Sequence, residues 1–314
     1  RLKEQDVDGL VIDLRNNGGG SLSTVVDIAG LFIKEGPIVQ VKSNGADSEI
    51  LKDKDPEILW DKPLVIMVNE ISASASEILA AAMQDYKRAV IIGSKQTYGK
   101  GTVQNVYDLN RWLRQNDLGD MGALKITTQK FYRINGGSTQ LEGVKSDVVV
   151  PDRFSYIDIG EKDLDNPLPW DKIAAADYEV WDGYIDYDQT ISNSNERMAK
   201  NKQLQLIEEN AKWIKSKQDD SVWPLNIDAY AAKMEQNEAE AKRFDELRNY
   251  ESGLTFKSLP YEIKKFENDT VLKQKRERWH EDLAKDVYMD EAINVLEDLK
   301  VNNIRRGKLA DVRD

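Results

Sequence analysis

The sequence has no cysteine and only one histidine, His280, among its 314 residues. Without cysteine the chain can form no disulfide, no thiolate metal site and no cysteine nucleophile. A single histidine also supplies too few ligands for a histidine-based zinc site. His280 lies in a charged stretch, far in sequence from the serine-rich segment described below, which argues against a Ser-His-Asp triad.

The sequence also lacks long apolar runs and an excess of positive charge. No run approaches 18 consecutive apolar residues, so no membrane-spanning helix is expected. The net charge is −12, whereas surfaces that bind nucleic acid are basic, so nucleic acid is not expected as a partner. The chain starts at Arg1 without a signal-peptide pattern. We therefore expect a fragment whose N-terminal region and targeting signal are missing.

Three serines lie between a predicted strand and a predicted helix. The apolar residues 63–68 predict a buried strand, and residues 78–86, which are apolar and rich in alanine, predict a helix. Between them are Ser72, Ser74 and Ser76. In the first turn of a helix, unpaired backbone N–H groups and the positive end of the dipole stabilise a developing anion, which suits a serine nucleophile.

The same segment also has a purely structural interpretation. Residues 74–77 fit a capping box, in which the Ser74 hydroxyl accepts from the backbone and Glu77 reaches back to it. This pattern is common before apolar helices. The segment alone therefore favours the capping role over the catalytic one.

A glycine-rich turn precedes the serine segment. Residues 9–14 predict a buried parallel strand, Gly18, Gly19 and Gly20 follow it, and a helical pattern starts at Leu22. Glycine is ordinary in a tight turn between a strand and a helix. Backbone N–H groups of these glycines could also form an oxyanion hole. The Lys-Ser/Thr pair of a phosphate-binding loop is absent.

Lys100 is the candidate base for a serine that has no histidine nearby. At pH 7 only roughly 0.04% of an ordinary lysine is neutral, but burial beside apolar groups lowers a lysine pKa by about 3–5 units. Lys100 lies between Gly99 and Gly101, shortly before Val103, a context that no other lysine of this region shares. Taken alone, it would still be interpreted as a surface lysine.

Further runs predict a first half rich in strands. Apolar or alternating patterns cover residues 37–42, 88–93, 124–134 and 147–150. Residues 43–62 are expected to form a hairpin tip or a surface loop. The character of the sequence changes near residue 152. We expect a core over residues 1–152, an irregular linker over 153–171 and a charged, elongated helical domain over 172–314.

Three motifs of the first half occur in an order and spacing that resemble the tail-specific, or C-terminal processing, serine proteases. They are residues 13–20, residues 72–78 and residues 99–104. The resemblance covers about residues 5–152, and the helical tail resembles the C-terminal extension of the long periplasmic members. It implies an α/β fold with a crotonase-like (ClpP/crotonase) ββα-type protease core, followed by a mainly α-helical domain.

The resemblance also implies a Ser-Lys dyad. Ser74 matches the nucleophile, Lys100 its base, and Gln104 the glutamine that orients the lysine. The oxyanion hole would be formed by backbone N–H groups of Ala75 and of a glycine, Gly19 or Gly20. Neither a cofactor nor a metal is implied.

The implied function is a serine endopeptidase that cleaves proteins near their C-termini, in envelope protein processing or quality control. Its substrates would be polypeptides with unstructured or apolar C-termini, and an adaptor protein could bind the helical domain. The implied location is the bacterial periplasm, near the inner membrane. We expect the PDZ domain that precedes the core in this family to be among the missing parts. Two alternatives stay open: an inactive fragment that acts as an interaction module, and a crotonase-like enzyme that acts on acyl-CoA esters.

Overall fold

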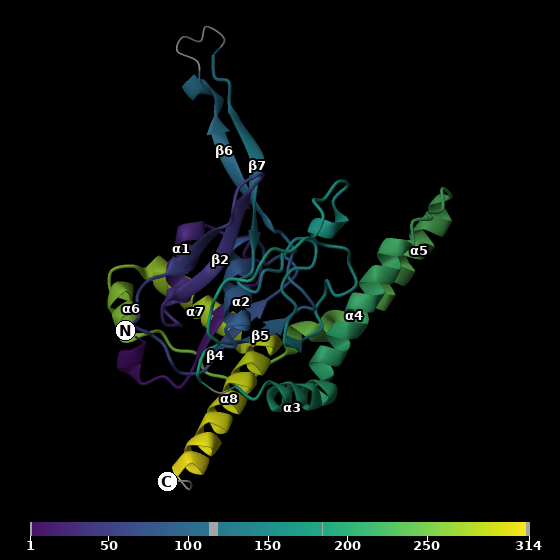
Figure 1. The fold of residues 1–314 in the computed structure, drawn as a ribbon. Helices are drawn as coiled ribbons and strands as arrows, with labels where there is room; N and C mark the ends of the chain where they lie inside the picture. Colours follow the sequence, from purple (N-terminus) through teal and green to yellow (C-terminus); the bar gives the residue numbers. More distant parts are fainter. Residues whose placement is uncertain (1, 113–118, 184, 312–314) are drawn as a thin grey trace.

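Two four-stranded sheets form the core of the first half of the chain (Figure 1). The structure is a computed structural model and describes residues 2–112, 119–183 and 185–311. The parallel sheet has the strand order β1 (Leu10–Asp13), β4 (Leu64–Val68), β5 (Val90–Gly93) and β8 (Val148–Val149). The antiparallel sheet has the order β3 (Glu49–Asp53), β2 (Gly36–Ser43), β7 (Ala123–Tyr132) and β6 (Thr102–Asp108).

Strand β4 shows how the sequence forms the two faces of the parallel sheet. Successive side chains of a strand point to opposite faces. Ile66 packs with residues of helices α1 (Leu22–Gly30) and α2 (Ala75–Asp85), whereas Val65 and Met67 pack with residues of the C-terminal helices. Both faces are covered, which explains why the strand is apolar at every position.

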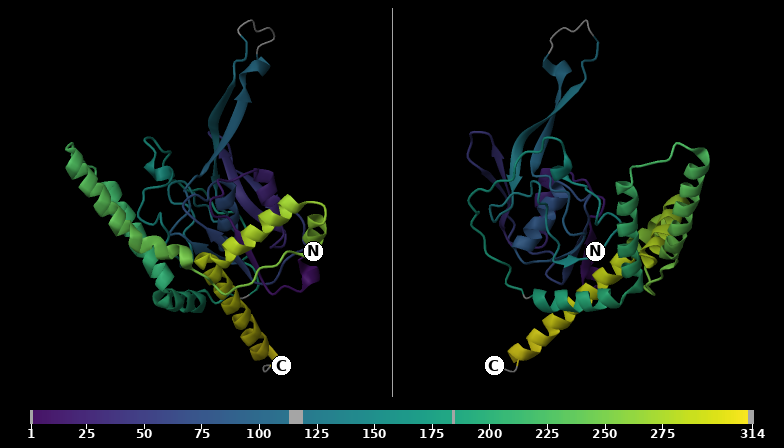
Figure 2. Two further views of the ribbon diagram at one scale, coloured as in Figure 1. Left: turned by 180° about the vertical axis from the view of Figure 1, so that it is seen from behind. Right: turned by 90° about the vertical axis from the view of Figure 1, so that its right-hand side faces the viewer.

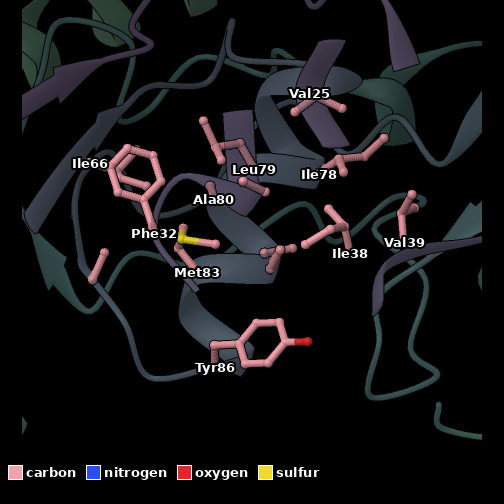
Figure 3. Packing of buried hydrophobic residues seen from close by; sticks show 14 of the residues in the cluster. Val25, Phe32, Ile38, Val39, Ile66, Ile78, Leu79, Ala80, Met83 and Tyr86 are labelled. Carbon is pink, nitrogen blue, oxygen red and sulfur yellow. The ribbon is translucent and has the colours of Figure 1, made fainter. Parts of the chain in front are cut away.

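Helix α2 is buried on all sides. Its first nine residues, from Ala75 to Met83, are all buried. Phe32, Ile38 and Ile66 lie around it in the apolar cluster (Figure 3). Most of these residues are apolar, as expected for a helix in a protein interior. The N-terminus of this helix is therefore held by the packing of the whole core.

Helices from the second half of the chain cover the other face of the parallel sheet. Val287, Ala292 and Val295 of α8 (Val287–Asp311) share one apolar cluster with Val65 and Met67 of β4. The remaining helices of this half are α3 (Tyr187–Lys200), α4 (Lys202–Asp219), α5 (Ile227–Ala241), α6 (Pro260–Phe266) and α7 (Thr270–Ala284). Short 3-10 helices are η1 (Lys3–Gln5), η2 (Leu109–Trp112), η3 (Glu161–Asp163) and η4 (Lys242–Asn249). The predicted fold class, an α/β core followed by a mainly α-helical part, is confirmed.

Residues 172–183 differ from the prediction, which placed helix from about residue 172. The first α-helix after the core begins at Tyr187. Backbone amides of the preceding segment donate to carbonyl groups of the core instead: Ile173 to Gly136, Ala176 to Ile134, and Trp181 to Tyr86. These tertiary hydrogen bonds satisfy backbone groups that a helix would otherwise satisfy. The segment therefore lies along the core in a non-helical conformation.

Two parts of the molecule project from the core (Figures 1 and 2). Strands β6 and β7 form a long ribbon, and helices α4 and α5 form an arm in a different direction. Helix α5 contains no buried residue. Across the described residues, the helices are too short or too polar to span a membrane.

Candidate active site

Ser74 lies at the N-terminus of the buried helix α2. It is the N-cap residue, with a φ of 59° and a ψ of −116°. A residue with a side chain rarely adopts such a conformation, which costs about 1–3 kcal/mol. The Ser74 side chain makes no capping hydrogen bond, while its N–H donates to Glu77 Oε2 at 2.8 Å. Ser74 and Glu77 therefore stand in the predicted capping-box arrangement, in which the bond to Glu77 is the hydrogen bond that is formed.

The two flanking serines have structural partners. Ser72 Oγ donates to the Leu14 carbonyl at 2.8 Å, and Ser76 Oγ donates to the Asn17 carbonyl at 3.0 Å. Both bonds tie the start of α2 to the segment that follows β1. Within the described residues, Ser74 is the one serine of the three whose hydroxyl has no hydrogen bond. Geometry thus singles out Ser74 as the candidate nucleophile.

The glycine turn packs directly against Ser74. Gly19 has a φ of +109°, and a β-carbon there would lie 2.7 Å from the Ser74 β-carbon, so the position requires glycine. The Gly19 N–H donates to Asn17 Oδ1 at 3.0 Å. The N–H groups of Gly20 and Ala75 have no acceptor among the described residues, and both residues line the pocket beside Ser74. This arrangement favours Gly20 over Gly19 as the partner of Ala75 in an oxyanion hole.

Lys100 is held by its backbone next to the same pocket. Its N–H donates to Glu77 Oε2 at 3.0 Å, and its carbonyl accepts from Thr139 Oγ1 at 3.0 Å. The Lys100 amine donates to Gln104 Oε1 at 3.2 Å. In the part of the chain that the structure describes, no hydrogen bond joins Lys100 Nζ to Ser74 Oγ. The two groups therefore share a pocket without a direct bond between them.

Glu77 connects the serine segment to the lysine segment, a role that the sequence motifs did not predict. Its buried carboxylate accepts four hydrogen bonds: from Ser74 N (2.8 Å), Thr97 Oγ1 (2.6 Å), Gly99 N (2.7 Å) and Lys100 N (3.0 Å). Burial raises the pKa of Glu77 to about 7, against these hydrogen bonds, which favour the ionised form. The sequence held one sign of this role, because Glu77 directly precedes a long apolar run and is therefore expected to be buried. A buried glutamate needs hydrogen-bond or charge partners.

One pocket of about 390 Å³ brings the predicted site residues together. It is lined by Gly18, Gly20, Leu22, Ser74, Ala75, Ile78, Lys100, Thr102, Val103, Gln104, Lys125 and Phe131. The three sequence motifs therefore meet in one place, although up to about 80 residues separate them along the chain. His280 is on α7, which contributes no residue to this pocket. Among the described residues there is no acidic or histidine cluster that could hold a metal ion.

A second polar cluster lies behind the serine turn and connects it to α8. Arg15 forms ion pairs with Asp13 at 2.7 Å and with Asp286 at 2.6 Å, which joins the end of β1 to the start of α8. Glu70 and Asp152 are buried beside each other. Burial, together with the hydrogen bond and repulsion from Asp152, raises the pKa of Glu70 to about 8. The helical half thus supports the site from the far face of the parallel sheet.

Comparison with known proteins identifies the family. Residues 1–150 match Peptidase family S41, and residues 154–301 match the family described as the C-terminal domain of tail specific protease. The chain belongs to the tail-specific protease family. This confirms the resemblance that was predicted from the three motifs.

Two relatives known from their sequences agree with this assignment. The chain is 41% identical over 251 residues to a tail-specific protease of Haemophilus influenzae, covering 79% of this chain and 36% of the relative. It is 37% identical over 150 residues to a carboxyl-terminal-processing protease of Synechocystis, covering 48% of this chain and 33% of the relative. Among solved structures, the photosystem II D1 C-terminal processing protease is similar at 34% identity with a TM-score of 0.41, covering 48% of this chain and 36% of that one. The chain spans roughly a third of the length of these relatives.

Proposed function

We propose that this chain carries the catalytic site of a serine endopeptidase with a Ser-Lys dyad, which cleaves proteins near their C-termini. The observation that carries the proposal is one pocket lined by both Lys100 and Ser74, whose hydroxyl makes no capping hydrogen bond at the N-terminus of α2. Membership of the tail-specific protease family supports the reaction class. It argues against the acyl-CoA alternative, in which a Ser-Lys pair has no use.

In the proposed reaction, the neutral amine of Lys100 accepts the proton of the Ser74 hydroxyl while Oγ attacks the scissile carbonyl carbon. The N–H groups of Gly20 and Ala75 donate to the oxyanion of the tetrahedral intermediate, each lowering the barrier by about 3–4 kcal/mol. The Lys100 ammonium then protonates the leaving amine, the C–N bond breaks and an ester with Ser74 remains. A water molecule that gives its proton to Lys100 hydrolyses this ester and restores the Ser74 hydroxyl.

Gln104 positions the lysine in this scheme. Its Oε1 accepts from Lys100 Nζ at 3.2 Å, which limits where the amine can lie. The backbone of Lys100 is fixed by Glu77 and Thr139, so we expect its side chain, rather than its backbone, to move toward Ser74. Catalytic hydrogen bonds often tighten only when the substrate is bound.

The remaining parts of the proposal rest on the family resemblance. Substrates are polypeptides with unstructured or apolar C-termini, and the apolar pocket residues Leu22, Ile78 and Phe131 suit such side chains. The location is the bacterial periplasm near the inner membrane, and an adaptor protein binds the helical half. The division into a protease core (1–152), a linker (153–171) and a C-terminal domain (172–314), whose α-helices begin at Tyr187, belongs to the same proposal.

Hydrolysis of casein and of a fluorogenic apolar peptide tests the proposed function. We expect cleavage by the wild type and a loss of about 100-fold or more for Ser74→Ala and for Lys100→Ala. Lys95→Ala, which changes an exposed lysine near the site in sequence, should keep wild-type activity. Equal activity of Lys100→Ala and wild type would contradict the dyad. If a longer polypeptide that contains this chain cleaves the substrates and this chain alone does not, this chain would be identified as an interaction module.

A further inference from the structure

Lys125 lines the pocket of Ser74 and Lys100, although no sequence motif pointed to it. It lies on β7, in the ribbon that projects from the core (Figure 1). Its side chain is exposed. Within the described parts of the chain, the Lys125 side chain takes part in no ion pair or hydrogen bond. The ammonium group of Lys125 thus borders the site without an ion-pair partner among the described residues.

The register of the ribbon places Lys125 on the same face as Gln104. Gln104 lies opposite Thr127, and Val106 lies opposite Lys125. Residues directly opposite each other share a face, as do residues two apart on one strand. Gln104 reaches Lys100 from this face, so the face looks toward the dyad. Diagonal neighbours such as Gln104 and Lys125 are about 7–8 Å apart.

The charged residues that line the pocket are all positive. Its described lining contains two lysines, Lys100 and Lys125, and no aspartate or glutamate. The buried carboxylate of Glu77, which does not line the pocket, is already the acceptor of four hydrogen bonds. The rest of the lining is apolar, glycine or neutral polar. Such a pocket favours an apolar segment that carries a negative group.

We propose that Lys125 binds a carboxylate of the polypeptide substrate while the scissile bond lies at Ser74. The inference rests on the proposed function and specifies its substrate. The distance of this carboxylate from the scissile bond along the substrate is measured with the peptide series described below. The carboxylate is either the C-terminal α-carboxylate or an Asp or Glu side chain. Lys125 is a specificity-determining residue in this account and takes no part in bond breaking.

Protection of Ser74 from a fluorophosphonate reagent tests the proposal without requiring turnover. The probes are apolar hexapeptides of alanine and valine, prepared as the free acid, as the amide, and as amides with glutamate or glutamine at each position in turn. For the wild type, one carboxylate form should protect about five- to tenfold better than its neutral counterpart, as expected for a charge-assisted bond. The free acid identifies the α-carboxylate as the source, and a glutamate amide identifies a side chain.

Three variants make this test specific. Lys125→Met should abolish the preference for the carboxylate form, and Lys125→Glu should reverse it. Lys52→Met removes a lysine from β3, at the opposite edge of the same sheet, and should leave the preference unchanged. Lys52→Met should also be labelled at Ser74 at the wild-type rate in the absence of peptide, and the protection of each variant is expressed relative to its own labelling rate without peptide. Raising the salt concentration should weaken the preference of the wild type, because salt screens exposed charges.

The outcomes separate this inference from the proposed function. If Ser74 is labelled but acid and neutral peptides protect equally, or neither protects, the assignment of Lys125 is wrong and the dyad stands. The assignment is also wrong if Lys125→Met keeps the wild-type preference. If the wild type is not labelled at Ser74 at all, the proposed function fails, and with it the inference.

Discussion

Helices α2 and α5 show two opposite ways in which this chain uses a helix. Helix α2 has 11 residues, and its first nine are buried between the two sheets (Figure 3). Helix α5 has 15 residues and buries none, and it lies on the arm that projects from the core (Figure 2). An isolated helix of this length is marginal in water. The core therefore fixes α2 far more firmly than the arm fixes α5.

The difference explains where the candidate nucleophile lies. A catalytic group has to be held to about 0.5 Å by its surroundings, and the N-terminus of a fully packed helix meets that demand. Ser74 at the start of α2 is fixed by the core, by the glycine turn and by Glu77. The start of α5 is capped only by Asn226 within its own turn. The predictions below test this comparison in order of decreasing effect on the free energy of unfolding.

Replacement of Glu77 by alanine should have the largest effect. It would leave four donors without their acceptor in the interior, and each buried unsatisfied group costs about 1–3 kcal/mol. We expect a loss of about 4 kcal/mol or more in the free energy of unfolding, measured by urea denaturation. Glu235→Ala on the exposed α5 is the matched control and should change it by about 0.5 kcal/mol or less. Similar effects for the two variants would contradict the contrast between the helices.

Two methionines provide a matched pair of apolar changes. Met83 in α2 is 0% exposed, and Met234 in α5 is 44% exposed. Met83→Ala should cost about 2–5 kcal/mol through lost burial and the resulting cavity. Met234→Ala should cost about 0.5 kcal/mol or less. A large cost for Met234→Ala in the isolated chain would show that the α5 surface is covered in solution.

Alanine variants of two glycines with positive φ distinguish the effect of backbone strain from the effect of contact with Ser74. Gly19 has a φ of +109° and lies against Ser74, whereas Gly45 has a φ of +73°, and a β-carbon added there would have nothing within 4 Å. Both alanine variants should lose about 1–3 kcal/mol of stability. Only Gly19→Ala should also slow fluorophosphonate labelling, because its new methyl group displaces Ser74. A wild-type rate of labelling for Gly19→Ala would contradict the close contact between the glycine turn and Ser74.

The smallest effect concerns pH. The pKa values of Glu77 and Glu70 are raised to about 7 and about 8 in the folded chain, above the ordinary value of about 4.3 in the unfolded chain. The folded state thus binds more protons, and its stabilisation is lost as the pH rises through 7 and 8. We expect the free energy of unfolding to fall by about 1 kcal/mol between pH 7 and pH 8. Glu70→Gln, which cannot ionise, should flatten this dependence, and a rise in stability over this range would contradict the assignment.

The sequence was sufficient to predict the elements around the site. Apolar runs with the period of buried strands and the small-residue turns after them predicted the strand–turn–helix units that carry Gly19, Gly20 and Ser74. These signals are local, because strand burial, turn chemistry and helix spacing all act within about ten residues. The choice of Ser74 among three serines came from the family resemblance. The structure adds a physical reason, since Ser72 and Ser76 each donate to a backbone carbonyl.

Features that depend on distant contacts could not be predicted in this way. Glu77 showed the pattern of a cap, and its bonds to Gly99 and Lys100 depend on a loop more than 20 residues away. Residues 172–176 have a helix-forming composition, yet their backbone bonds to the core, so tertiary contacts overrode propensity. Strand β3 arises within the expected surface segment 43–62, because it pairs with β2. Lys125 enters the pocket only through the register of the ribbon.

The position of the fluorophosphonate adduct tests the central claim most directly. The chain would be treated with the reagent, digested, and the modified residue identified by mass spectrometry in the wild type and in Lys100→Ala. The account predicts an adduct on Ser74, none on Ser72 or Ser76, and a rate of labelling at least about 100-fold lower in Lys100→Ala. An adduct on another serine, or an unchanged rate in Lys100→Ala, would contradict the Ser74-Lys100 dyad.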